Sequence, residues 1–123
     1  MKIDHVQLAC PRGGEEQARA FFAEVLGMQE EEKPEPLRER GGCWFRSGEM
    51  IVHVGIDPAF VPQTKGHPAF LVEDLEGLAA RLEAAETEVK WDEVLPDRRR
   101  FFTSDPFGNR IEFLQEGDGF SER

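Results

Sequence analysis

Hydrophobic and polar residues alternate in several short segments of the chain, and a period of two residues predicts β-strands. In the first segment Val6 and Leu8 fall on one side, whereas His5 and Gln7 fall on the other. One face of such a strand packs on the core and the other faces away from it. The pattern, together with one charged edge segment at 28–33, predicts strands at residues 2–9, 28–33, 43–46, 50–56, 67–72, 88–92, 99–103 and 109–115.

Two other segments have apolar residues at helical spacing. Residues 15–26 begin with two glutamates, which suit the positive end of a helix dipole, and Gly27 follows as a C-terminal glycine. The second helix begins after Asp74, a good N-cap, and carries apolar residues on one face as far as Leu82. Residues 34–42 are polar and contain prolines, so we interpret them as a loop and a candidate mobile flap.

The order strand, helix, strand, strand, strand occurs twice, with about 60 residues in each copy, which predicts two repeated modules. The expected fold class is α+β, with two βαβββ modules forming a curved mixed sheet around a cleft. We expect a first module at residues 1–56, a linker with prolines and a glycine at 57–66, a second module at 67–116 and a C-terminal tail at 117–123, together one domain. The end of the tail is expected to fray.

A tight turn precedes the last predicted strand. Pro106 presets φ at one turn position, and Gly108 supplies the positive φ that closes a three-residue hairpin. In the strand that follows, Ile111 and Phe113 point one way and Glu112 points the other. The sequence therefore predicts one carboxylate on the face opposite this apolar pair.

Composition narrows the classes of partner. The formal net charge is −10 at pH 7, which argues against nucleic acid and an anionic membrane surface, because both would repel the chain. Arg98, Arg99 and Arg100 form the only basic run, which we interpret as a solvated junction paired with glutamates rather than as an anion-binding patch. Cys10 and Cys43 lie far apart beside apolar residues, so we expect buried thiols in a cytoplasmic protein.

The three histidines of the chain and one glutamate fall on strand faces directed away from the predicted core. His5 and His67 lie on the first strands of the two modules, whereas His53 and Glu112 lie on the last strands. If the two sheets curve around one cleft, they would place three imidazoles and one carboxylate in it, a set that suits a divalent transition metal. A single strand histidine is more often solvated or hydrogen-bonded, so the interpretation depends on the matched positions in the two repeats.

With these features the sequence resembles the vicinal oxygen chelate superfamily, also called the glyoxalase/bleomycin-resistance/dioxygenase superfamily. The resemblance covers nearly the whole chain and is carried by the paired modules and by the motifs Ile3-Asp4-His5-Val6, Gly66-His67-Pro68-Ala69-Phe70 and Asp105-Pro106-Phe107-Gly108-Asn109-Arg110-Ile111-Glu112. It implies a homodimer that binds a small-molecule substrate. It also implies a divalent metal (Zn, Ni, Mn or Fe(II)) held by residues matching His5, His67 and Glu112, with His53 at the fourth matching position.

Departures from individual members leave the reaction class open among isomerisation, lyase and transfer chemistry. Glyoxalase I enzymes carry a carboxylate where this chain has His53, so their two-base proton shuttle is not matched. Ring-cleaving dioxygenases share the two-histidine, one-glutamate set but add a cleft histidine and a tyrosine, and this chain has no tyrosine. Fosfomycin-modifying thiol transferases bind their anionic substrate with lysine, arginine and tyrosine residues that find no clear match here. Epimerases of acyl thioesters usually have glutamine at one ligand position.

The first of two functional hypotheses is a metal-dependent enzyme. The metal would coordinate two neighbouring substrate oxygens as a Lewis acid, and Glu112 or a metal-bound hydroxide would be the catalytic base. Trp44 and Arg46 share one face of their strand and are candidates to bind a planar or carboxylate-bearing substrate. Gln7 lies beside His5 and is a candidate to hydrogen-bond there.

The second hypothesis is a metal-free binding module, similar to the bleomycin-sequestering members of the superfamily. Such a module holds a ligand in the cleft of a dimer without turning it over. Trp44, Phe101, Phe102 and the negative charge of the chain would then bind a cationic aromatic ligand.

Overall fold

The chain folds into two four-stranded mixed sheets, one in each half. The computed structural model describes residues 1–118, and the last five residues of the predicted C-terminal tail lie outside this range. The strand order is β1-β4-β3-β2 in the first sheet and β5-β8-β7-β6 in the second. The strands are β1 (Val6–Cys10), β2 (Gln29–Glu31), β3 (Cys43–Ser47), β4 (Met50–Ile56), β5 (Ala69–Val72), β6 (Lys90–Asp92), β7 (Arg100–Ser104) and β8 (Arg110–Gln115). The predicted α+β class and the repeat are confirmed, although β1 begins later than expected and leaves His5 just before it.

Short helices complete each half. They are α1 (Glu15–Ala18), η1 (Arg19–Val25), α2 (Glu35–Arg38) and α3 (Leu75–Ala84). Asp74 caps α3 as predicted, because its Oδ1 accepts a hydrogen bond from the backbone N–H of Gly77 at 3.0 Å. The first helix widens into a π-helix, in which the N–H of Leu26 bonds the carbonyl of Phe21, five residues earlier, at 2.9 Å. None of the helices within residues 1–118 has the length and apolar character needed to cross a membrane.

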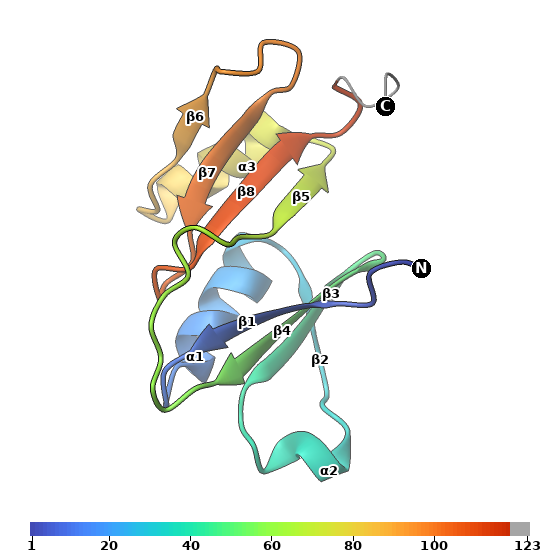
Figure 1. Ribbon diagram of the computed structural model, residues 1–123, viewed down its shortest axis with the longest axis vertical. Helices are drawn as coiled ribbons and strands as arrows, with labels where there is room; N and C mark the ends of the chain where they lie inside the picture. Colours follow the sequence, from blue (N-terminus) through green and yellow to red (C-terminus); the bar gives the residue numbers. More distant parts are fainter. Residues whose placement is uncertain (119–123) are drawn as a thin grey trace.

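The predicted loop at residues 34–42 is partly wrong, since it contains α2. A proline in the first turn of a helix loses no hydrogen bond, so the prolines that indicated a loop also permit this helix. Figure 1 shows α2 at the end of the molecule that lies farthest from the second sheet.

The apolar faces of both sheets pack into a single core with η1 and α3. Its fully buried aromatic side chains come from both halves of the chain: Phe22, Phe45, Phe101 and Phe113. The expectation that Phe101 lines a ligand cleft is therefore wrong, because Phe101 points to the core side of β7 and Phe102 to the other side. The same core leaves the polar face of each sheet directed outward.

One buried asparagine links the last turn to both the first module and the linker. The side-chain amide of Asn109 donates to the carbonyl of Ala9 and to the carboxylate of Asp105, both at 2.8 Å. Its Oδ1 accepts from the backbone N–H of Gln63 at 3.1 Å. Asn109 is 2% exposed, so these bonds are shielded from water. The Asp-Pro turn is therefore a joint between the modules as well as a hairpin.

Candidate functional site

The outward face of the first sheet carries three stacked rings. The ring of Trp44 lies 3.8 Å from that of His53 at an interplanar angle of 2°, because Trp44 and His53 are opposite one another on β3 and β4. His5 stacks on the other side of His53, with ring centroids 4.0 Å apart. Burial, and then the neighbouring His5, lowers the pKa of His53, which favours the neutral imidazole that metals bind.

A carboxylate fixes the orientation of His5. Oδ2 of Asp4 lies 2.8 Å from Nδ1 of His5, and this hydrogen bond lowers the pKa of Asp4. An ionised carboxylate can only accept, so Nδ1 of His5 carries the hydrogen, and in the neutral ring Nε2 is the nitrogen with the free lone pair. Carboxylate–histidine pairs of this kind commonly orient a metal ligand. Sequence reasoning missed Asp4, although an acidic residue directly before a candidate ligand was a usable signal.

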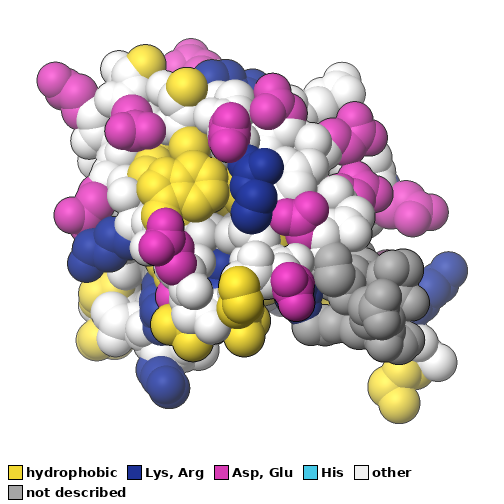
Figure 2. Space-filling model, turned by 90° about the horizontal axis from the view of Figure 1, so that it is seen from above, with side chains coloured by type: hydrophobic (Ala, Val, Ile, Leu, Met, Phe, Trp, Pro, Cys, Tyr) yellow, Lys and Arg dark blue, Asp and Glu magenta, His cyan; other side chains and the backbone are white. Residues whose placement is uncertain are grey.

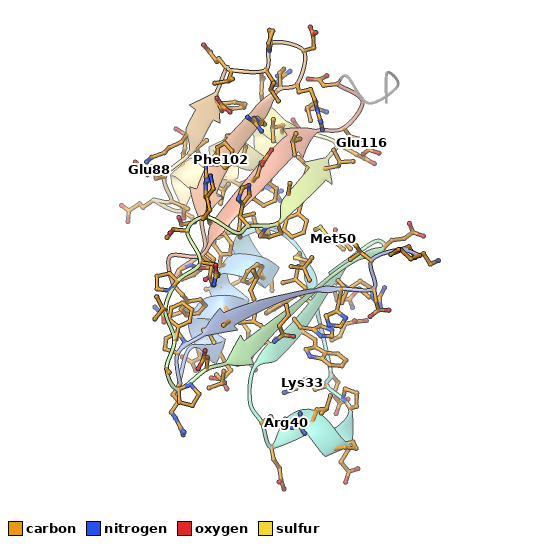
Figure 3. The ribbon with its side chains drawn as sticks, viewed as in Figure 1. Lys33, Arg40, Met50, Glu88, Phe102 and Glu116 are labelled. Carbon is orange, nitrogen blue, oxygen red and sulfur yellow. The ribbon has the colours of Figure 1, made fainter. Side chains whose placement is uncertain are left out.

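The residues predicted to bind substrate line one pocket of about 700 Å³ on this face. Trp44 forms part of its wall through the ring stack. Arg46 lies at the pocket and pairs with Glu31, with Nε and Oε2 at 2.9 Å. Gln7 also lines it, and its amide nitrogen lies over Gly55, where a Cβ would force the Gln7 side chain to move. Figure 3 labels two cations that also line the pocket, Lys33 and Arg40 beside α2.

The outward face of the second sheet holds the other two predicted ligands in direct contact. Nε2 of His67 lies 2.9 Å from Oε1 of the buried residue Glu112. Nδ1 of His67 is 2.9 Å from the carbonyl oxygen of Lys65, which can only accept a hydrogen bond. In the neutral imidazole, the Nε2 lone pair would therefore face an ionised carboxylate. Either a second proton on the imidazole, which makes the pair an ion pair, or a divalent metal bound to both atoms satisfies this contact, so the donor set is compatible with a metal.

Arg100 belongs to this cluster, contrary to the prediction that the basic run is a solvated junction. Its Nη1 lies 3.1 Å from Oε2 of Glu112 and its Nη2 2.5 Å from Oδ2 of Asp92. Arg99, the next residue, behaves as expected and pairs with exposed Glu76 at 2.7 Å. Arg99 directly precedes β7, and the alternation of side chains along an extended chain turns it and Arg100 to opposite sides. The prediction was wrong because it treated three adjacent arginines as one surface feature.

Phe102 packs against two arginines and a histidine on the second outward face. The guanidinium carbon of Arg110 is 4.0 Å from the centroid of its ring, and that of Arg100 is 5.3 Å away. The ring of His67 meets Phe102 edge-on, with centroids 5.5 Å apart. Beside Phe102 and Arg110 is a small pocket of about 170 Å³, with Lys90 in its wall. Phe102 and Glu88, both labelled in Figure 3, line this pocket together.

One chain does not assemble the four predicted ligands. Within residues 1–118, no three His, Cys, Asp or Glu side chains are grouped so that they could hold a metal ion. His5 meets His53 on the first sheet, and His67 meets Glu112 on the second. The shared core explains the separation, because it draws the apolar faces together and turns the polar faces outward.

The two pairs nevertheless occupy equivalent positions in the repeat. In the first module β1 runs parallel to β4 with Gln7 opposite His53, and in the second β5 runs parallel to β8 with Ala69 opposite Glu112. His5 and His67 each lie two residues before the first member of these register pairs. Each module therefore contributes one residue before its first strand and one from its last strand.

Comparison with known proteins gives the family. Residues 2–113 match the model of the Glyoxalase/Bleomycin resistance protein/Dioxygenase superfamily, and the chain belongs to this superfamily. A comparison with curated proteins gave no match.

Solved structures agree with this assignment. A glyoxalase family protein from Bacillus anthracis is 49% identical, with a TM-score of 0.90 over 94% of each chain. The fosfomycin resistance protein FosX from Listeria monocytogenes is 16% identical, with a TM-score of 0.78 over 100% of this chain and 98% of its own. Lactoylglutathione lyase from Agrobacterium tumefaciens is 20% identical, with a TM-score of 0.68 over 90% and 92%. At these identities the last two likenesses concern the fold alone.

Proposed function

We propose that the protein is a divalent-metal-dependent enzyme of the lyase, isomerase or transferase type that acts on a small cytoplasmic substrate with vicinal oxygens. In this proposal a homodimer completes the site, with His5 and His53 of one subunit facing the partner's His67 and the partner's Glu112. The observation that carries it is the His67–Glu112 pair, in which Nε2 and Oε1 lie 2.9 Å apart on an outward face. The equivalent positions of the two pairs in the repeat supply a geometric reason for pairing them across a two-fold axis.

The residues of the chain would divide the work as follows. A bound Zn, Ni, Mn or Fe(II) ion would supply Lewis-acid chemistry for the two substrate oxygens. Asp4 orients His5, and Arg100 holds the second oxygen of Glu112, so both ligands are positioned before substrate arrives. Glu112 is also the candidate proton acceptor, and Trp44 provides a flat surface for the substrate.

Metal content tests the proposal. The protein is purified without chelator and analysed by elemental mass spectrometry beside His5→Ala and Glu112→Ala variants. We expect about one metal per chain in the wild type and little in either variant, because each variant lacks one ligand in both sites of the dimer. Absence of metal from the wild type, even after loading with each of the four ions, would contradict the enzyme hypothesis.

Mixing the two variants tests where the site forms. If ligands come from two subunits, unfolding and refolding the variants together at equal amounts gives half heterodimers, each with one intact site. About a quarter of the wild-type metal should then return. A site built within one chain would regain none, since every chain carries one defective ligand.

A metal-free binding module is the second candidate, favoured by the ring stack on the first sheet. The rings of Trp44 and His53 are stacked with nearly parallel planes, and the pocket beside them is lined by Glu31 and Asp4 as well as by Lys33, Arg40 and Arg46. The flat ring surface suits a planar aromatic ligand. Ligand binding that survives a His5→Ala/His67→Ala double substitution, in a protein that takes up no metal, would favour this candidate over the enzyme.

A further inference from the structure

We propose that Arg110, with Lys90 beside it, is a recognition site for an oxyanion on the substrate, next to the metal position. This inference rests on the proposed function, in which the metal binds the vicinal oxygens of the same substrate. Its own basis is the charge distribution on the outward face of the second sheet, where the basic side chains differ in whether a carboxylate already neutralises them.

The arginine beside Glu112 is already neutralised. Arg100 is 19% exposed and pairs with both Asp92 and Glu112. Arg110 has a different environment, since its guanidinium lies 4.0 Å from the centroid of Phe102 and, within residues 1–118, no carboxylate oxygen lies within ion-pair distance of it. Stacking uses the flat face of a guanidinium and leaves the N–H groups at its edge free to donate. Arg110 therefore presents an oriented guanidinium whose N–H groups have no ion-pair partner within the described residues.

The pocket beside Arg110 has the size of a small polar group. It measures about 170 Å³, and its lining includes Lys90, Thr64 and Ser104. Glu88 also lines it and lies 3.7 Å from Nζ of Lys90, so the charged side chains there are two cations and one carboxylate. In a chain with a net charge of −10, a local excess of positive charge is unusual. Figure 2 shows acidic side chains spread over the face seen from above, with some Lys and Arg side chains among them.

The spacing between Arg110 and Glu112 limits the length of the substrate. The two residues are two apart on β8 and so lie on the same face, about 7 Å apart along the strand. An oxyanion held by Arg110 and oxygens held near Glu112 must therefore belong to one short molecule. The substrate class is a small carboxylate, phosphonate or phosphate whose vicinal oxygens lie two or three bonds from the anionic group.

The test uses probes that differ only in the anionic group. Glycerol 3-phosphate and 3,4-dihydroxybutanoate each combine a vicinal diol with an anion, and glycerol is the neutral control. Binding to the metal-loaded protein is measured by calorimetry for wild type, Arg110→Gln and Arg99→Gln. Arg99→Gln is the matched control, because it removes the same charge from an exposed arginine paired with Glu76.

We expect Arg110→Gln to weaken binding of at least one anionic probe about tenfold or more, because a charged hydrogen-bonding partner is lost. Metal content and glycerol binding should not change, and Arg99→Gln should bind both anions like the wild type. Arg110→Lys, which keeps the charge without the fork, should be intermediate. The ratio of the two anion affinities distinguishes a carboxylate site from a phosphate site.

Two results would overturn the inference. One is equal affinity of wild type and Arg110→Gln for both anions, and the other is no binding of either anion to the wild type. Failure of the proposed function is seen separately, as absence of metal from the wild type. Anion binding that depends on Arg110 in such a metal-free protein would support the oxyanion site and reject only the metal chemistry.

Discussion

Replacing Asn109 with alanine should strongly destabilise the fold, because this side chain joins three parts of it. The substitution removes the bonds to Ala9 and Asp105 and the bond from the N–H of Gln63. A net hydrogen bond contributes about 1 kcal/mol, and one to a charged group about 1.5 to 3 kcal/mol. Asn109 is 2% exposed, so water cannot readily replace the lost hydrogen bonds. We expect the free energy of unfolding to fall by about 3 to 5 kcal/mol.

Urea unfolding at fixed protein concentration measures this change. With a slope of about 2 kcal/mol per molar urea, the midpoint should fall by roughly 1.5 to 2.5 M. Gln63→Ala is the matched control, because only the backbone of Gln63 takes part in the joint, and it should change stability by less than about 0.5 kcal/mol. A loss below about 1 kcal/mol in Asn109→Ala would refute the reasoning, since it would mean that the modules are held together without the buried amide.

Three further predictions concern other parts of the fold. Burial raises the pKa of Cys10 to about 11, so the folded state holds the thiol proton more tightly than the unfolded state does. The free energy of unfolding should therefore fall as pH rises from 9 toward 11. It should fall less in Cys10→Ala, which lacks the thiol. Gly42→Ala should lower the free energy of unfolding, measured by heat or urea, by more than about 2 kcal/mol, because φ is +86° and a Cβ would overlap the carbonyl oxygen of Val54. Gly48→Ala is the control and should lower it clearly less, because Gly48 has φ +60° but open space around it. Asp74→Ala should cost about 1 kcal/mol by loss of the N-cap of α3, and retention of full stability would show that packing alone holds this helix.

The proposed dimer would combine the two ligand pairs that the repeat places on separate modules. Each module alone presents two candidate ligands, whereas a site for a divalent metal needs at least three. Two copies related by a two-fold axis could form two complete sites, each from the outward faces of different subunits. The proposed homodimer and the predicted ligand set therefore depend on each other, and the mixing experiment with His5→Ala and Glu112→Ala tests both together.

Local patterns in the sequence determined the elements and the faces of the strands. Alternation separated Val52 and Val54 from His53, and it assigned Glu112 to the face opposite Ile111, because a strand side chain has only two directions available. The cap of α3 was equally readable, since capping depends on residues three apart. For the same reason, the α+β class and the two modules could be predicted with most element boundaries within a few residues.

Only the tertiary structure decided which side chains on those faces meet. The alternation of side chains along a strand assigns a residue to one face of the sheet. Contact between two residues also depends on the register between strands that are distant in sequence, as for His67 and Glu112, which are 45 residues apart. The pairing of Arg100 with Glu112 depends on the β7–β8 register in the same way. The separation of His5 from His67 depends on how the two modules share one core, which is set by the packing of apolar faces and not by any local pattern.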